Sequence, residues 1–314
     1  MKKFILLSVC LVFALASVAA AQTFKIGVTV IVEHPALQSD QEGFAQALAD
    51  AGIQAEYDVQ NAQGQMANAK AIADKFKSDK VDLVHAIATP TAQAAVKAIK
   101  NIPVVYSSVT DPVAAGLVKT MEPSGTNVTG ISDLLPIERQ LRLYAEMAPK
   151  AKRWATIYNS GETNSVVLVK LAKAAWEKMG KEVIEVSVSN SSEVYRAAQS
   201  LIGRADAVYV TTDNTVISAL PSVAKVCNSN KIALFAGDVD SINKGALAAL
   251  GFNYYQVGYS AGKKAVQVLK GKKPGAIASG YTEKMDLRLN LKNAASQGVK
   301  IADKYVKMAD KVIK

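Results

Sequence analysis

The feature that most constrains the fold is an alternation of short apolar runs with amphipathic segments, which starts near residue 25 and occurs a second time further on. The apolar runs are continuous and rich in β-branched residues, which is typical of strands buried on both faces. A strand, helix, strand order predicts a parallel sheet with helices on both faces. Buried strands are expected at residues 26–32, 55–59, 81–88 and 103–107, and again at 153–158, 182–188, 205–210 and 231–235.

Segments with helical spacing lie between these strands, and the two halves of the chain repeat in order and element length. Residues 46–52 correspond to 174–180, and residues 82–91 correspond to 206–215. A chain of 314 residues is long enough for two domains. The prediction is therefore an α/β protein with two related, doubly wound lobes. Helices are expected at residues 39–51, 65–78, 91–99, 164–179, 192–202 and 215–227.

The polypeptide is expected to cross between the lobes three times, at residues 130–133, 250–252 and 282–290. A helix at 256–269 would return to the first lobe after the second crossing. Three crossings form a hinge about which two lobes can open and close. We expect a signal peptide at 1–21, an N-terminal lobe of 24–132 plus 252–283, and a C-terminal lobe of 133–251 plus 284–314.

The first 21 residues have the composition of a secretory signal peptide. Lys2 and Lys3 precede an apolar run at 4–16, and small residues occupy 17–21. Cleavage there would leave 293 residues with one cysteine, Cys227, and therefore no intrachain disulfide. We expect export to the periplasm without a lipid anchor, because no small residue comes just before Cys10, as lipidation would require.

Composition excludes several kinds of protein. Half of the chain is hydrophobic and a fifth is charged, which is inconsistent with disorder. Two cysteines and two histidines are too few for a Cys/His zinc cluster, and we expect no metal and no cofactor. The net charge of +10 falls to +8 without Lys2 and Lys3, and the remaining lysines are scattered and not interleaved with aromatic residues. We interpret them as a solvated surface and expect no nucleic-acid partner.

The candidate site lies where the predicted strands end. Ligands of doubly wound sheets bind beyond the carboxyl ends of the strands, and helices starting there direct backbone N–H groups toward a bound anion such as a carboxylate. Ordinary helix caps are the alternative explanation for each such residue. The polar strand ends include Glu33, His34, Pro35, Thr89, Pro90, Thr91, Ser108, Asn159, Asn164, Ser165, Asp213, Asn214, Thr215 and Asp238.

Several motifs, in order from residue 25 onward, carry a family resemblance. They include Val-Thr-Asp-Pro-Val-Ala-Ala-Gly-Leu-Val at 109–118, Asn-Val-Thr-Gly-Ile-Ser at 127–132, Ile-Val-Glu-His-Pro-Ala-Leu at 31–37 and Thr-Asp-Asn-Thr-Val at 212–216. Together they resemble the extracytoplasmic substrate-binding proteins of ABC transporters, in the group that includes binders of tryptophan and other aromatic amino acids. The resemblance implies a type I periplasmic binding protein fold.

The resemblance also implies a function. Two lobes would close over a small ligand, which we expect to be an amino acid, and deliver it to an inner-membrane permease; a monomer is expected. The α-carboxylate would bind hydroxyl and N–H groups at Thr89, Thr91, Asn164 and Ser165, and the ammonium would need Asp213 or Asp238. An aromatic ligand side chain would lie against Tyr254, His34 and Pro35.

Three other functions compete with this interpretation. An enzyme is disfavoured because no Gly-x-Ser-x-Gly motif, phosphate-binding loop or dinucleotide fingerprint occurs, although paired carboxylates are not excluded by sequence. A transcription regulator would need a helix-turn-helix where the signal peptide lies. A binding protein for a different solute, or one that serves a chemoreceptor, remains an alternative.

Overall fold

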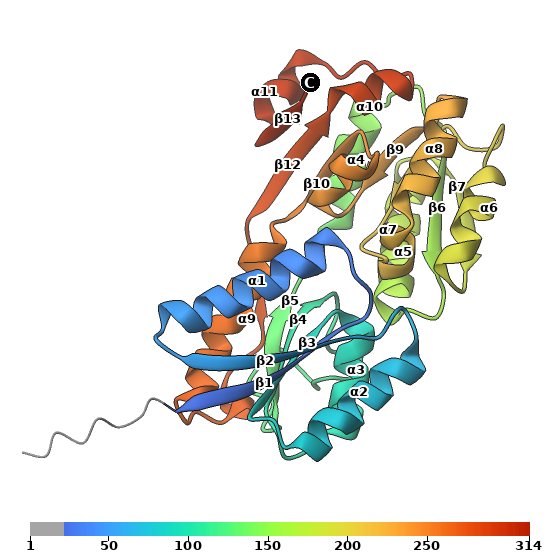
Figure 1. Ribbon diagram of the computed structural model, residues 1–314. Helices are drawn as coiled ribbons and strands as arrows, with labels where there is room; N and C mark the ends of the chain where they lie inside the picture. The colour runs from blue at the N-terminus through green and yellow to red at the C-terminus, as the bar shows by residue number, and fades with distance from the viewer. Residues whose placement is uncertain (1–21) are drawn as a thin grey trace, which may run out of the picture.

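The computed structural model describes residues 22–314, so the predicted signal peptide lies outside the described residues. Two sheets form the centres of two lobes, seen below and above one another in Figure 1. Both sheets are mostly parallel, as predicted, with one antiparallel pair between β10 and β12. No helix within 22–314 is long and apolar enough to cross a membrane.

The first sheet has the strand order β11-β5-β4-β3-β1-β2. Helices α1 and α9 pack together beside it, as do α2 and α3. The bounds are β1 Thr23–Val30, α1 Pro35–Asp50, β2 Gln54–Asn61, α2 Met66–Asp79, β3 Leu83–Ile87, α3 Thr89–Ala98, β4 Val104–Val109, β5 Val128–Ser132, α9 Tyr254–Leu269 and β11 Gly280–Tyr281.

The second sheet has the order β13-β12-β10-β9-β8-β6-β7. Its helices include the packed pairs α4 with α5 and α6 with α8. The bounds are α4 Ile137–Met147, β6 Arg153–Asn159, α5 Thr163–Lys178, β7 Glu182–Val188, α6 Val194–Gln199, β8 Ala207–Val210, α7 Asn214–Ser218, α8 Leu220–Asn230, β9 Ala233–Ala236, β10 Ala248–Phe252, β12 Met285–Asn290, α10 Leu291–Ser296, α11 Asp303–Met308 and β13 Lys311–Ile313, with short 3₁₀ turns at Ser191–Glu193 and Val239–Lys244. A further 3₁₀ turn, Pro274–Ala276, belongs to the first lobe, where it packs against β5.

Glycines allow helix α9 to complete the first lobe. A Cβ atom on Gly258 would lie 1.8 Å from the backbone oxygen of Asp40, and one on Gly43 would lie 2.0 Å from that of Tyr255. The backbones of α1 and α9 therefore approach more closely than any side chain at these positions would allow. This contact joins the first helix of the lobe to one that follows it by some 200 residues of chain.

The chain passes between the two sheets three times. It leaves β5 at Asp133, returns after β10 at Asn253, and leaves again between β11 and β12. The second crossing comes one residue later than the predicted boundary, because Phe252 still belongs to β10. All three connections run between the lobes, where a change in a few backbone angles can reorient one lobe against the other.

The structure corrects three details of the predicted elements. The runs at 55–59 and 182–188 are not buried strands: β2 and β7 are sheet edges with largely half-buried or exposed side chains. The single helix expected at 215–227 is two helices, α7 and α8, and Pro221 lies in the first turn of the second, where a missing N–H costs nothing. Helix α1 begins earlier than predicted, at Pro35, for the same reason.

Candidate functional site

A closed cavity lies between the two lobes, at the carboxyl ends of strands from both sheets. The first lobe contributes residues after β1 and within β4, and the second contributes residues after β6, β8 and β9; Asp133 and Tyr254 come from two of the crossings. Ligands of open α/β sheets bind at this end of the strands. The lining residues are His34, Ala36, Leu37, Ser108, Asp133, Asn164, Thr212, Asn214, Ile217, Asp238 and Tyr254.

The free space in this cavity is small. It amounts to about 10 Å³, which is about the room that one water molecule needs. The lobes also touch beside it, where the Gln93 side chain of α3 donates a hydrogen bond of 3.3 Å to the Thr163 hydroxyl of α5. The structure is therefore a closed form, and a solute as large as an amino acid enters only when the lobes part or the lining side chains move.

Six of the predicted site residues line the cavity, and nine do not. His34, Ser108, Asn164, Asn214, Asp238 and Tyr254 come together there. Glu33 and Pro35 are exposed, and Glu33 lines a separate hollow outside His34. The other seven predicted residues are absent from the lining: Thr89, Pro90, Thr91, Asn159, Ser165, Asp213 and Thr215.

Several of these seven side chains are engaged in local hydrogen bonds instead. The Thr91 hydroxyl donates to the backbone oxygens of Ile87 and Ala88. The Asp213 carboxylate accepts from the backbone N–H groups of Asn159, at 2.6 Å, and Val216, at 2.7 Å. Asp213 therefore caps α7, which is the ordinary explanation for an aspartate at a helix start.

Glu162 organises the second-lobe wall of the cavity. Its buried carboxylate accepts hydrogen bonds from the backbone and side chain of Asn214, from those of Thr215, and from the Asn164 side-chain amide. It thus joins the first turns of α5 and α7. The Asn164 Nδ2 atom also donates to the backbone oxygen of Thr212 at 3.1 Å, and these bonds fix the orientation of the amide. In this orientation the Asn164 Oδ1 atom has no hydrogen-bond partner.

A buried polar network lies behind the first-lobe wall. Asp40 accepts hydrogen bonds from the hydroxyls of Ser107, at 2.7 Å, and Ser108. The Ser107 hydroxyl also lies 2.7 Å from the His85 ring, which stacks on Phe44 at 3.8 Å. Ser108 adopts a left-handed backbone conformation with φ of 52°. Its hydroxyl proton is committed to Asp40, so Ser108 can offer the cavity only an acceptor.

The surroundings of the cavity disfavour charge on the ionisable side chains that line it. Burial, followed by the charge of Asp240, raises the pKa of Asp238 to about 6. Burial likewise raises the pKa of Asp133 to about 6, although the hydrogen bond from Tyr254 opposes this shift. Burial and the charge of Lys244 lower the pKa of His34 to about 3, so its ring is neutral. Each shift favours the uncharged group, as expected where water is excluded.

Four polar atoms in the lining have no hydrogen-bond partner among the described residues. They are His34 Nδ1, Asp133 Oδ1, Asn164 Oδ1 and Thr212 Oγ1. Buried polar atoms are normally paired, and each unpaired one costs free energy. These four come from both lobes and from the hinge, so a single polar solute placed between the lobes could satisfy them together. Asp133 and Thr212 were not among the predicted site residues, although Asp133 directly follows β5 and Thr212 lies two residues after the end of β8.

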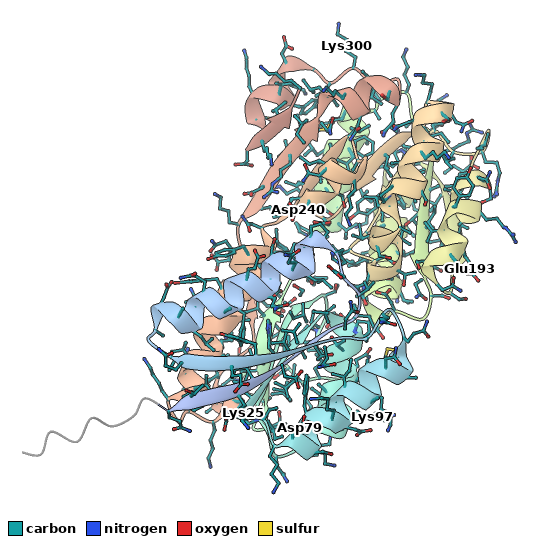
Figure 2. The ribbon with its side chains drawn as sticks, in the orientation of Figure 1. Lys25, Asp79, Lys97, Glu193, Asp240 and Lys300 are labelled. Carbon is teal, nitrogen blue, oxygen red and sulfur yellow. The ribbon has the colours of Figure 1, made fainter. Side chains whose placement is uncertain are left out.

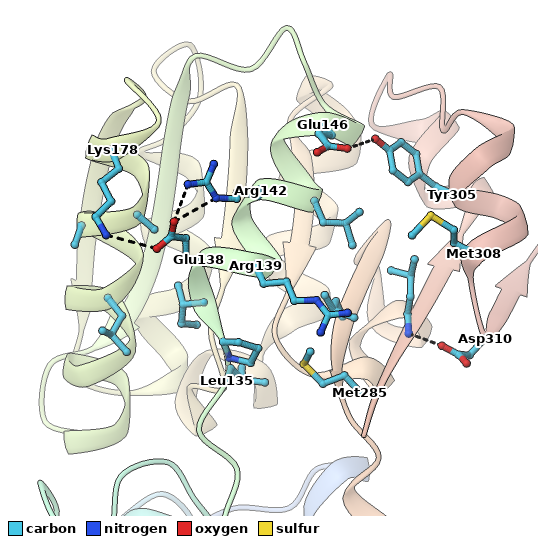
Figure 3. Close-up of a pocket in the computed structure, with 18 of the residues that line it drawn as sticks. Leu135, Glu138, Arg139, Arg142, Glu146, Lys178, Met285, Tyr305, Met308 and Asp310 are labelled. Atoms are coloured by element: carbon cyan, nitrogen blue, oxygen red, sulfur yellow. Dashed lines mark hydrogen bonds and ion pairs between the residues drawn. The ribbon is translucent and has the colours of Figure 1, made fainter. Parts of the chain in front are cut away.

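A larger hollow of about 1030 Å³ lies on the second lobe alone, between α4, α5, β12 and α11 (Figure 3). Glu138 pairs there with Arg142 at 2.7 Å and with Lys178 at 3.5 Å, while Arg139 points into the hollow near Met285. Every residue of its lining belongs to the second lobe. Closure of the lobes would not cover a solute there, so this hollow does not fit a site that works by closure.

The outer surfaces of both lobes carry the lysine excess. The labelled residues Lys25 and Lys97 lie on the first lobe and Lys300 on the second, all exposed (Figure 2). No group of three or more potential metal ligands occurs among residues 22–314.

Two hinged α/β lobes that meet at their strand ends around a polar cavity define a solute-binding protein that works by lobe closure. The family model described as ABC transporter substrate binding protein matches residues 25–313, so the chain belongs to this family. A tyrosine-binding protein of Clostridioides difficile is 45% identical over 270 residues, covering 85% of this chain and 78% of that protein.

Solved structures confirm the predicted type I periplasmic binding protein fold. A Streptococcus pneumonia structure, described as an ABC domain in complex with L-Trp, has a TM-score of 0.89 at 32% identity and covers 93% of this chain and 100% of that one. A ligand-free, open substrate-binding protein with adhesive properties from Clostridium difficile has a TM-score of 0.69 at 41% identity, covering 93% and 99%. That relative is described as open, whereas the small cavity between the lobes shows that this chain has the closed arrangement.

Proposed function

We propose that this protein binds an amino acid with an aromatic or large apolar side chain between its lobes and delivers it to an ABC permease. The observation that carries this proposal is the closed interlobe cavity, where unpaired polar atoms from both lobes and the hinge lie beside apolar groups. A zwitterion with an apolar side chain has the matching chemistry. The tyrosine-binding relative and the L-Trp complex support an aromatic amino acid.

The proposed contacts divide the ligand into two parts. The side chain would pack against Leu37 and Ile217 and the rings of His34 and Tyr254, which together give a flat apolar wall. The α-carboxylate would accept a hydrogen bond from the Thr212 hydroxyl, close to the first turn of α5, where the helix dipole favours negative charge. Ser108, Asn164, Asn214 and Asp238 would complete the contacts.

The proposed setting follows from the predicted signal peptide and from the family. The chain would be exported, lose residues 1–21, and act in the periplasm as a monomer with two lobes, of 24–132 plus 253–283 and of 133–252 plus 284–314. Export would place it on the side of the membrane from which an importer takes its solute. It would bind and release the ligand without changing it chemically.

A calorimetric titration tests this proposal. Residues 22–314 are purified under denaturing conditions to remove any carried ligand, refolded, and titrated with each of the twenty amino acids. We expect L-tyrosine or L-tryptophan to bind most tightly and His34→Ala to weaken binding. Arg139→Ala, in the larger hollow, is the matched control and should bind as the wild type does. No binding by any amino acid, or equal loss from both variants, would contradict the proposed site.

A further inference from the structure

Asp133 occupies a position that no other cavity residue shares. It directly follows β5 at the first crossing between the lobes, its side chain is 2% exposed, and it lines the cavity. Its backbone N–H donates to the Val109 oxygen at 3.2 Å, which fixes it to the end of β4. Asp133 therefore faces the cavity from the hinge itself.

The two carboxylate oxygens of Asp133 have different surroundings. Oδ2 accepts a hydrogen bond of 2.8 Å from the hydroxyl of Tyr254, the first residue after the second crossing. Oδ1 is buried and has no partner. The Thr110 hydroxyl is among the groups that lower the pKa of Asp133, but no hydrogen bond joins it to Oδ1. One oxygen thus joins two crossings, and the other is available to a ligand.

The other acidic residues expected to hold an ammonium group are already engaged. Asp238 accepts from the Asp240 N–H at 2.9 Å and from the Ser241 hydroxyl at 3.0 Å, which caps the 3₁₀ turn at Val239–Lys244. Asp213 caps α7 and lies outside the lining. Of the three, only Asp133 has an unused carboxylate oxygen facing the cavity.

We propose that Asp133 Oδ1 is the acceptor for the protonated amine of the ligand and so determines that the protein selects amino acids over their deaminated analogues. This inference rests on the proposed function. An ammonium group carries three donors, and the unpaired Asn164 Oδ1 in the same cavity supplies a neutral second acceptor. Because Oδ2 remains bonded to Tyr254, the ligand contact is made on a carboxylate whose orientation is already set.

The inference also explains why an aspartate is kept where burial disfavours its charge. A buried carboxylate is costly unless it is paired. In the closed form Asp133 is shielded from water, so water cannot stabilise its charge. A ligand ammonium would supply the missing counter-charge in that form. Ligand and closure would therefore stabilise each other through this one contact.

Two titrations test the inference, with Asp133→Asn as the variant, Asp238→Asn as the comparison at the other acidic lining residue, and Asp206→Asn, outside the cavity lining, as the matched control. The probes are L-tyrosine and 3-(4-hydroxyphenyl)propanoate, which lacks only the amine. We expect Asp133→Asn to weaken L-tyrosine binding by about 10- to 150-fold, the range for a hydrogen bond to a charged group, and to leave the propanoate unaffected or bound more tightly. Asp206→Asn should bind both probes as the wild type does, and Asp238→Asn should keep the preference for the amine even if its overall affinity falls.

The outcomes separate this inference from the proposed function. If the wild type binds no amino acid, the proposed function fails and the role of Asp133 fails with it. If the wild type binds L-tyrosine and Asp133→Asn binds it equally well, only the role of Asp133 is refuted. Should the variant not fold, a crystal structure of the wild-type complex decides: the amine nitrogen lies within hydrogen-bond distance of Asp133 Oδ1, or it lies elsewhere and the inference is wrong.

Discussion

Asp133→Asn should change the pH dependence of stability in the ligand-free protein. The fold raises the pKa of Asp133 from 3.8 to about 6, so the folded state disfavours the ionised carboxylate. A shift of this size corresponds to about 3 kcal/mol. The native state binds the proton more tightly than the unfolded state, and the cost of ionisation is therefore absent below the unfolded pKa, grows as pH rises, and is complete above the folded pKa.

The asparagine side chain does not ionise, so the variant has no cost of burying a charge at position 133 at any pH. An amide can still accept the Tyr254 hydrogen bond, and any cost of burying its NH₂ group is the same at every pH. Between about pH 4 and about pH 7, the free energy of unfolding of the variant should therefore rise relative to wild type by about 2 to 3 kcal/mol. This relative rise is the quantity to measure, because constant effects of the substitution cancel from it.

Urea denaturation of both proteins, followed by circular dichroism at the two pH values, measures this difference. Asp206→Asn is a matched control, since the Asp206 pKa is lowered to about 2 by its hydrogen bond with Arg153, and both of its pKa values lie at or below the acid end of the range. Its curve should stay nearly parallel to wild type. Parallel curves for wild type and Asp133→Asn would refute the argument that Asp133 is held as a costly buried charge.

Three further predictions concern the fold and its closure. Gly258→Ala places a Cβ 1.8 Å from the Asp40 oxygen, so it should lower the unfolding free energy by about 1 to 3 kcal/mol or more in thermal or urea unfolding; an unchanged value would mean that α1 and α9 separate freely. Gln93→Ala removes the hydrogen bond to Thr163 between the lobes and a second one of 3.1 Å to the Ala115 oxygen within the first lobe; it should weaken ligand binding by about 2- to 10-fold and lower the unfolding free energy of the first lobe by about 0.5 to 1.5 kcal/mol, whereas equal affinity would show that the contact with Thr163 does not hold the closed form. The Cys227 thiol is 1% exposed and burial raises its pKa to about 12, so it should react with a disulfide reagent only after unfolding; rapid reaction of the native protein would contradict its burial.

The sequence was sufficient for the architecture because each local pattern agrees with the overall fold. Continuous apolar runs became central strands, and the side chains of His85, Trp154 and Trp176 are buried in the core. Edge strands were harder to recognise, because the runs at 55–59 and 182–188 are apolar enough to resemble central strands, and strand order depends on contacts between distant segments. The contact of Gly258 with α1 likewise joins segments that lie far apart in the sequence.

The candidate site was predicted only in part. Strand ends identify a region, and six predicted residues do meet there, but they do not reveal which polar side chain faces the cavity and which caps its own helix. Asp213 and Asp238 have the same sequence signal, an aspartate before a helical turn, and only Asp238 lines the cavity. Asp133 follows a strand and precedes an irregular segment, which gives no local signal for a site residue. The orientation of its carboxylate depends on a hydrogen bond from Tyr254, which is 121 residues away.

Small-angle X-ray scattering with and without ligand tests the central claim most directly. Residues 22–314, stripped of ligand, are measured alone and with a concentration of L-tyrosine or L-tryptophan that calorimetry shows to be saturating. The account predicts that the ligand-free protein is more extended and that the liganded curve converges on the closed structure described above. Identical curves in the two states would contradict closure of the lobes over an amino acid.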